Sequence, residues 1–151
     1  MLRRGQELEN YINGLIFELE ALGIHGHKNN ALRTIKGYTL RGEPFDYEIF
    51  MPDKIHVFDA KECSAKNLRW PLSGFNDPSS RFNKQLSALL MCSQNEHVKA
   101  YFLVWFKQSN QFICFTPQQV YHALFDGRTY LLPLAGSKWS LPLDLNIMKG
   151  K

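Results

Sequence analysis

The sequence has few cysteines, no long apolar run and no low-complexity tract, and these absences exclude several classes of protein. Cys63, Cys92 and Cys114 are odd in number and widely spaced, without a CxxC pair, which fits reduced thiols better than disulfides or a zinc site. The longest apolar run, over 100–106, is too short to span a bilayer. The first residues lack the apolar stretch of a signal peptide. We therefore expect a cytoplasmic protein with no membrane partner.

The composition is that of an ordinary globular chain with a slight basic excess. The 151 residues are 44% hydrophobic and 21% charged, which predicts one domain over 1–151 with a real core. Eighteen basic residues against 14 acidic ones give a net charge of +4. This excess hints at a polyanionic partner, although a basic but otherwise ordinary protein explains it as well.

Apolar spacing and turn residues predict helices and strands in mixed order. In chain order, we expect a helix over 5–22, strands over 45–51 and 54–61, a loop over 63–80, a helix around 82–90, strands over 100–106 and 111–115, and a helix over 117–124. Residues 31–40 could hold one or two short strands, and the tail over 131–147 has no clear periodicity. This order indicates an α/β domain with a mixed sheet.

The two strands after residue 44 place charged residues at defined positions. If Met51 pairs with Lys54 across the turn, Asp46 lies directly opposite Asp59. Because strand side chains alternate, Lys61 shares the face of Asp59. Two facing acids repel each other unless a cation is bound between them, and Mg²⁺ is the usual cation at such a position. A three-residue bulged loop would break this register.

Two further polar residues lie on the apolar sides of the predicted helices. Glu9 shares the stripe of the first helix, and Gln85 shares that of the second. A carboxylate and an amide that point inward need partners, which a metal site would supply. Alternatively, Glu9 pairs with Arg3 or Arg4, and Gln85 caps a buried backbone group.

Basic and aromatic side chains offer candidate contacts to nucleic acid. Four basic residues fall between positions 28 and 41, where they could bind phosphates or form a solvated face. In the loop over 63–80, aromatic rings could stack on unpaired bases or anchor the loop to the core. The candidates for DNA binding are Lys28, Arg33, Lys36, Arg41, Arg69 and Trp70.

These motifs together resemble those of a known nuclease family. Pro44-Phe45-Asp46 followed by Asp59-Ala60-Lys61 resembles the PD-(D/E)xK signature. The segment over 4–9 with Ile12-Asn13 is similar to the opening helix of RecU-type Holliday junction resolvases. Asp46-Tyr47 and the segment over 58–62 are similar to that family's "DY" and "FEAKE" segments. The last similarity is to its "FPL-x-x-F" loop and helix glutamine, at Trp70-Pro71-Leu72, Phe75 and Gln85.

The resemblance spans about residues 4–125 and implies a restriction-endonuclease-like mixed β-sheet flanked by α-helices. It implies that Glu9, Asp46 and Asp59 bind Mg²⁺, with Mn²⁺ as a substitute, and that Lys61 acts on the attacking water or scissile phosphate. Gln85 would support the site. Asp59 stands where the bacterial resolvases usually carry Glu. The segment before Asp46 is shorter than the family's stalk region, which suits a phage-encoded member acting in the host cytoplasm.

Three functional hypotheses follow. The first is a Mg²⁺-dependent endodeoxyribonuclease that resolves four-way DNA junctions as a homodimer, since a junction with approximate two-fold symmetry needs two symmetric nicks. The second keeps the nuclease but changes the substrate to duplex DNA in general, ends or flaps. The third is a non-catalytic DNA-binding module whose acids only form salt bridges.

Overall fold

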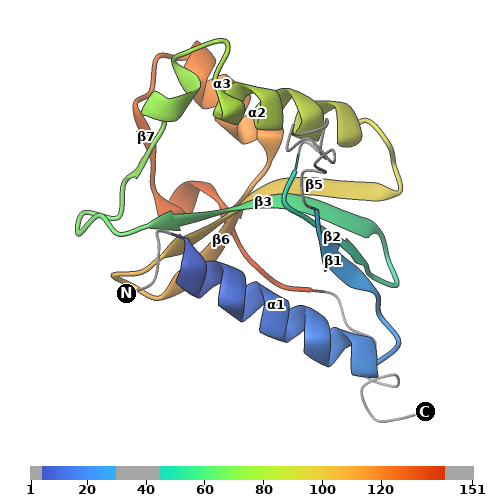
Figure 1. Ribbon diagram of the computed structural model, residues 1–151. Coiled ribbons are helices and arrows are strands. Elements are labelled where there is room, and N and C mark those ends of the chain that lie inside the picture. Colours follow the sequence, from blue (N-terminus) through green and yellow to red (C-terminus); the bar gives the residue numbers. More distant parts are fainter. Residues whose placement is uncertain (1–4, 30–44, 142–151) are drawn as a thin grey trace, which may run out of the picture.

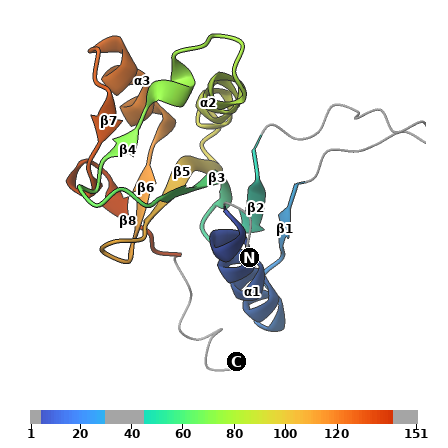
Figure 2. The ribbon, with the colours of Figure 1, turned by 60° about the vertical axis from the view of Figure 1, so that its left-hand side comes forward.

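A computed structural model describes residues 5–29 and 45–141 and shows a mixed α/β architecture. A six-stranded, mostly antiparallel sheet has the order β1-β2-β3-β5-β6-β8. Helix α1 covers one face of the sheet, and α2 and α3 cover the other (Figures 1 and 2). The helices and strands are α1 (Gln6–Ala21), β1 (Gly26–Lys28), β2 (Tyr47–Phe50), β3 (Ile55–Cys63), β4 (Trp70–Pro71), η1 (Ser73–Phe75), α2 (Arg81–Cys92), β5 (Val98–Phe106), β6 (Gln111–Phe115), α3 (Pro117–Phe125), β7 (Tyr130–Leu131), η2 (Pro133–Ala135) and β8 (Ser137–Lys138). This confirms the predicted α/β class with a mixed sheet.

Helices α2 and α3 each begin at a residue whose side chain caps the first turn. Ser80 caps α2, and its side chain accepts a hydrogen bond from the backbone N–H of Asn83. Thr116 and Gln119 form a capping box at α3, with Pro117 in the first turn, where its missing N–H costs nothing. No helix in the described ranges is long and apolar enough to cross a membrane.

The register of the β2–β3 hairpin is the predicted one. Tyr47 pairs with Phe58, and Phe50 pairs with Ile55. The N–H of Met51 donates to the carbonyl of Lys54 at 3.1 Å, so no bulge shifts the strands. The position opposite Asp59 is therefore that of Asp46, although Asp46 lies just before β2.

Strand β3 occupies the centre of the sheet and extends further than predicted. All nine of its residues pair with β5 in parallel, from Ile55 with Val98 to Cys63 with Phe106. This long-range pairing carries the strand two residues past the predicted end at position 61. Two buried clusters, one on each face, form the core.

Two regions that lacked a clear sequence pattern contain short strands. The predicted loop over 63–80 includes β4, which pairs with β7 from the tail. The tail also supplies β8, which pairs with β6 at the sheet edge. Each pairing joins residues distant in sequence, so no local pattern announces it. The possible strands over 31–40, and the tail beyond residue 141, lie outside the described residues.

Candidate functional site

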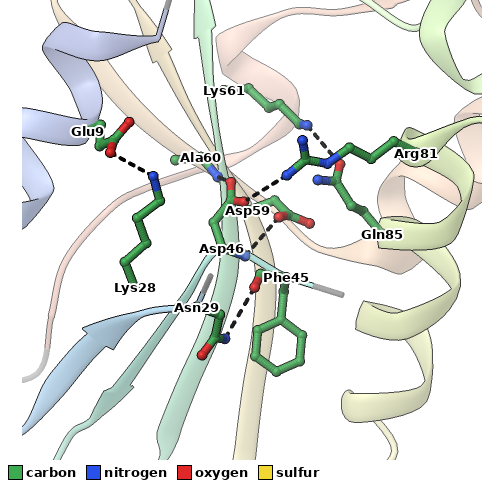
Figure 3. A network of polar contacts seen from close by, with 10 residues as sticks. All are labelled: Glu9, Lys28, Asn29, Phe45, Asp46, Asp59, Ala60, Lys61, Arg81 and Gln85. Carbon is green, nitrogen blue, oxygen red and sulfur yellow. Dashed lines mark hydrogen bonds and ion pairs between the residues drawn. The ribbon is translucent and has the colours of Figure 1, made fainter. Parts of the chain in front are cut away.

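Asp46 and Asp59 face each other across β2 and β3, as predicted. The backbone N–H of Asp46 donates to Asp59 Oδ1 at 3.0 Å. The backbone N–H of Ala60 donates to Asp46 Oδ2 at 3.2 Å (Figure 3). Each carboxylate therefore accepts a hydrogen bond from a backbone N–H of the opposite segment of the hairpin.

The strand end that carries Asp46 is fixed by β1. The backbone N–H of Asn29 donates to the Asp46 carbonyl at 2.7 Å, and the Asn29 side-chain amide donates to the Phe45 carbonyl at 3.2 Å. These bonds extend the β1–β2 pairing by one step beyond Lys28 and so limit the movement of the Asp46 backbone.

Asp59 is completely buried, and one of its carboxylate oxygens, Oδ2, has no hydrogen-bond partner among the described residues. Burial raises the pKa of Asp59 to about 8, and the nearby charge of Asp46 contributes to that rise. The site therefore needs either a proton or a cation at Asp59 near neutral pH.

Lys61 and Gln85 form the second part of the site. Lys61 Nζ donates to Gln85 Oε1 at 2.8 Å and lies 4.1 Å from the centre of the Phe82 ring. Gln85 is only 3% exposed, which confirms the prediction that it points inward. Its amide oxygen accepts the hydrogen bond from the Lys61 side chain. Burial lowers the pKa of Lys61, while the charges of Asp59 and Asp46 oppose that shift.

Glu9 faces the same region from α1, but it does not join the two aspartates. Lys28 Nζ lies 2.6 Å from Glu9 Oε1 (Figure 3). Within the described ranges, no group of three or more His, Cys, Asp or Glu residues is arranged to hold a metal ion. The structure thus brings together two of the three carboxylates that the resemblance implied. The alternative partners, Arg3 and Arg4, lie outside the described residues.

These side chains meet at a cleft of about 440 Å³ between α1, α2 and the sheet. Charged residues of both signs line it, and the Asp59 side chain lies beneath its surface. The lining residues that carry charge or an amide are Glu9, Lys28, Asn29, Asp46, Lys61, Glu62, Arg81 and Gln85.

Arg81 is a residue of the site that the sequence analysis missed. It opens α2, and its Nη2 lies 3.6 Å from Asp46 Oδ1. A signal was available, because Arg81 precedes Gln85 by four residues and so shares its side of the helix.

The predicted DNA contacts have different outcomes. Lys28 lines the cleft, and Arg69 is exposed with its guanidinium 4.3 Å from the centre of the Tyr130 ring. Arg33, Lys36 and Arg41 lie outside the described residues.

Trp70, which was predicted to bind DNA, lies in the core. Trp70 is 4% exposed and packs against Phe75, Phe102 and Phe115, so its faces are not available to bases. The pairing of β4 with β7 holds this ring in the core. This environment favours the alternative interpretation, an aromatic residue that anchors the loop to the core.

No protein-family model matches the chain, and a search of curated proteins finds no match. Function is therefore inferred from the geometry and chemistry of the site.

Proposed function

We propose that this protein is a metal-dependent endodeoxyribonuclease of the PD-(D/E)xK type, with a restriction-endonuclease-like fold. One observation carries the proposal: the fully buried Asp59 faces Asp46, and Lys61 lies on the same strand, held by Gln85. Two acids and a lysine in this relation support the proposal, because the resemblance to the PD-(D/E)xK signature implies that they lie together.

Asp46 and Asp59 are the residues that would hold Mg²⁺, or Mn²⁺ in its place. Asp59 Oδ2 has no hydrogen-bond partner within the described ranges, and this and the raised pKa of Asp59 fit a hard cation that prefers carboxylate oxygens. Such an ion, when bound, would lower the pKa of a water molecule and stabilise negative charge at a scissile phosphate. Glu9 would contribute only after separating from Lys28.

Lys61 would supply a fixed positive charge beside the reacting groups. Its contacts with Gln85 and the Phe82 ring restrict its position, and its burial strengthens its field, because little water screens it. Burial also lowers the pKa of Lys61, which makes proton transfer at Nζ easier than at an exposed lysine. Gln85 acts by positioning Lys61.

We propose the four-way DNA junction as the substrate, on the basis of the RecU-type motifs. The net charge of +4 is too small to discriminate among DNAs that present the same phosphates, so the shape of the junction would set selectivity. A homodimer would provide the two symmetric nicks.

The test is cleavage of a labelled four-way junction and of a matched linear duplex, in Mg²⁺ and in EDTA. We expect paired, symmetric nicks in the junction, and none in EDTA. Equal cleavage of both DNAs would leave a general nuclease, while no cleavage of any DNA in Mg²⁺ or Mn²⁺ would refute the proposal.

A further inference from the structure

Each of two acids that line the cleft is paired with a cation from a different part of the fold. Lys28, at the end of β1, lies 2.6 Å from Glu9 on α1. Arg81, at the start of α2, lies 3.6 Å from Asp46. Figure 3 shows the two cations reaching the acids from opposite sides of the strand that carries Ala60 and Lys61.

These two ion pairs are easy to break. The Arg81 side chain is 81% exposed, so water and salt screen its attraction to Asp46, and the half-buried pair of Lys28 and Glu9 is screened in part. Ion pairs at a protein surface shift an equilibrium by no more than about fivefold. A divalent ion carries twice the charge of either side chain, and it would displace them from the carboxylates.

Arg81 is also placed to contact a ligand that extends past the cleft. A second hollow, of about 980 Å³, adjoins the first and shares Lys61, Glu62, Arg81 and Phe82 with it. Arg81 therefore lies where the two hollows meet. A guanidinium at this point can bind a phosphate through two parallel hydrogen bonds.

We propose that Lys28 and Arg81 are exchangeable counterions, which pair with Glu9 and Asp46 until metal binds and then transfer to phosphates of the DNA. This inference rests on the proposed nuclease function and adds a coupling between its two ligands. Metal releases the cations, and DNA accepts them, so each ligand strengthens the binding of the other by the same factor.

The coupling is tested by substituting each cation with an uncharged residue of similar length. The variants are K28Q, R81Q and the double variant. K84Q, on α2, and K54Q, an exposed residue in the β2–β3 turn, serve as controls for the loss of one positive charge. Thermal unfolding followed by circular dichroism verifies that all the variants are folded.

The first measurement is Mn²⁺ binding to DNA-free protein, by calorimetry. We expect K28Q and R81Q each to bind Mn²⁺ about two- to fivefold more tightly than the wild type, because a competing cation has gone. K84Q and K54Q should bind Mn²⁺ as the wild type does.

The second measurement is junction binding by fluorescence anisotropy, with and without Ca²⁺, with a gel to verify that the DNA stays intact. Wild type, K84Q and K54Q should bind the junction more tightly with Ca²⁺. The double variant should lose this gain, and its log–log salt slope should fall by about 0.9 for each phosphate that the protein no longer neutralises.

Two results separate the inference from the function on which it rests. In the first result, wild-type protein binds Mn²⁺ and cleaves DNA, but K28Q and R81Q bind Mn²⁺ no more tightly than the wild type and still bind the junction more tightly in Ca²⁺. The proposed exchange of counterions would then be wrong, while the proposed nuclease function would stand. If wild-type protein binds no Mn²⁺ and cleaves no DNA, both are wrong.

Discussion

Strand β3 buries titratable side chains at two points, and their surroundings differ. Near the start of the strand, His56 has no exposed surface, and its Nδ1 lies 3.1 Å from the Tyr101 hydroxyl. That hydroxyl also accepts a hydrogen bond from Trp139 Nε1 at 3.0 Å. Three residues further on, Asp59 faces a second acid, Asp46. Among the described residues, His56 Nε2 and Asp59 Oδ2 each have no hydrogen-bond partner, so the two points differ in the charge of the neighbouring groups.

The difference separates a structural polar cluster from one suited to binding. The partner of His56 Nδ1 is neutral, and burial lowers the pKa of His56, so the imidazole stays neutral inside the core. Asp53, 3.5 Å from His56 Nε2, opposes this shift only in part. Burial raises the pKa of Asp59, and the neighbouring acid Asp46 raises it further, so the ionised form of the site is destabilised. Such a pair of acids does not stabilise the folded protein, but it is suited to binding a cation.

The largest expected effect comes from removing either acid of the Asp46–Asp59 pair. Asp59→Asn and Asp46→Asn should each reduce cleavage by roughly a thousandfold or more, because the metal would lose a ligand. DNA binding should stay the same or tighten, because a negative charge near phosphate has gone. A plasmid-nicking assay in Mg²⁺ measures the first effect and a gel-shift assay the second. Nicking by both variants at the wild-type rate would contradict the site.

The next effect concerns Lys61, which lies on the same side of β3 as Asp59. Lys61→Met should lower the cleavage rate roughly a hundredfold, since a positioned charge and proton donor has gone. Gln85→Leu should lower the rate less, because Lys61 remains but loses its acceptor. Single-turnover cleavage measures both, with Lys66→Met, an exposed lysine of the following loop, as the control. An equal rate for Lys61→Met and Lys66→Met would refute the assignment.

The Asp59 region should also give the protein a pH-dependent stability when metal is absent. The pKa of Asp59 is raised to about 8 in the folded state, so the folded state holds a proton that the unfolded state releases above about pH 4. The free energy of unfolding should therefore fall as pH rises from about 4 to 8, by up to about 1.4 kcal/mol per pH unit. Urea titrations in EDTA measure this slope. Asp59→Asn should lower the slope, and an unchanged slope would show that Asp59 ionises freely.

The His56 region should show the opposite slope. Because the pKa of His56 is lowered on folding, the unfolded state takes up a proton below about pH 6.5 while the folded state resists it. The free energy of unfolding should therefore fall as the pH drops below about 6.5. The same urea titrations on His56→Gln measure the contribution of His56, which is the part of the pH dependence of the free energy of unfolding that this variant loses. A wild-type slope in this variant would place the dependence elsewhere.

Much of this site could be predicted from the sequence, because short-range geometry fixes it. The turn between Met51 and Lys54 sets the register, and the register places Asp46 opposite Asp59. Strand alternation then places Lys61 on the side of Asp59, and helical spacing turns Gln85 inward.

Other features depended on neighbours that the sequence pattern does not contain. Trp70 is in the core because β4 pairs with β7, which comes much later in the chain. Glu9 pairs with Lys28 because α1 packs on the same side of the sheet edge as the end of β1. A residue's type and spacing do not reveal these partners.

The sequence by itself determined which residues face one another within a hairpin and along a helix, since turn length and backbone period act over a few residues. The tertiary structure decided what those residues experience. Parallel pairing with β5 and the packing of α2 bury Asp59, raise its pKa and bring Gln85 to Lys61. Burial and electrostatic environment depend on all the neighbours in space, and these come from distant parts of the chain.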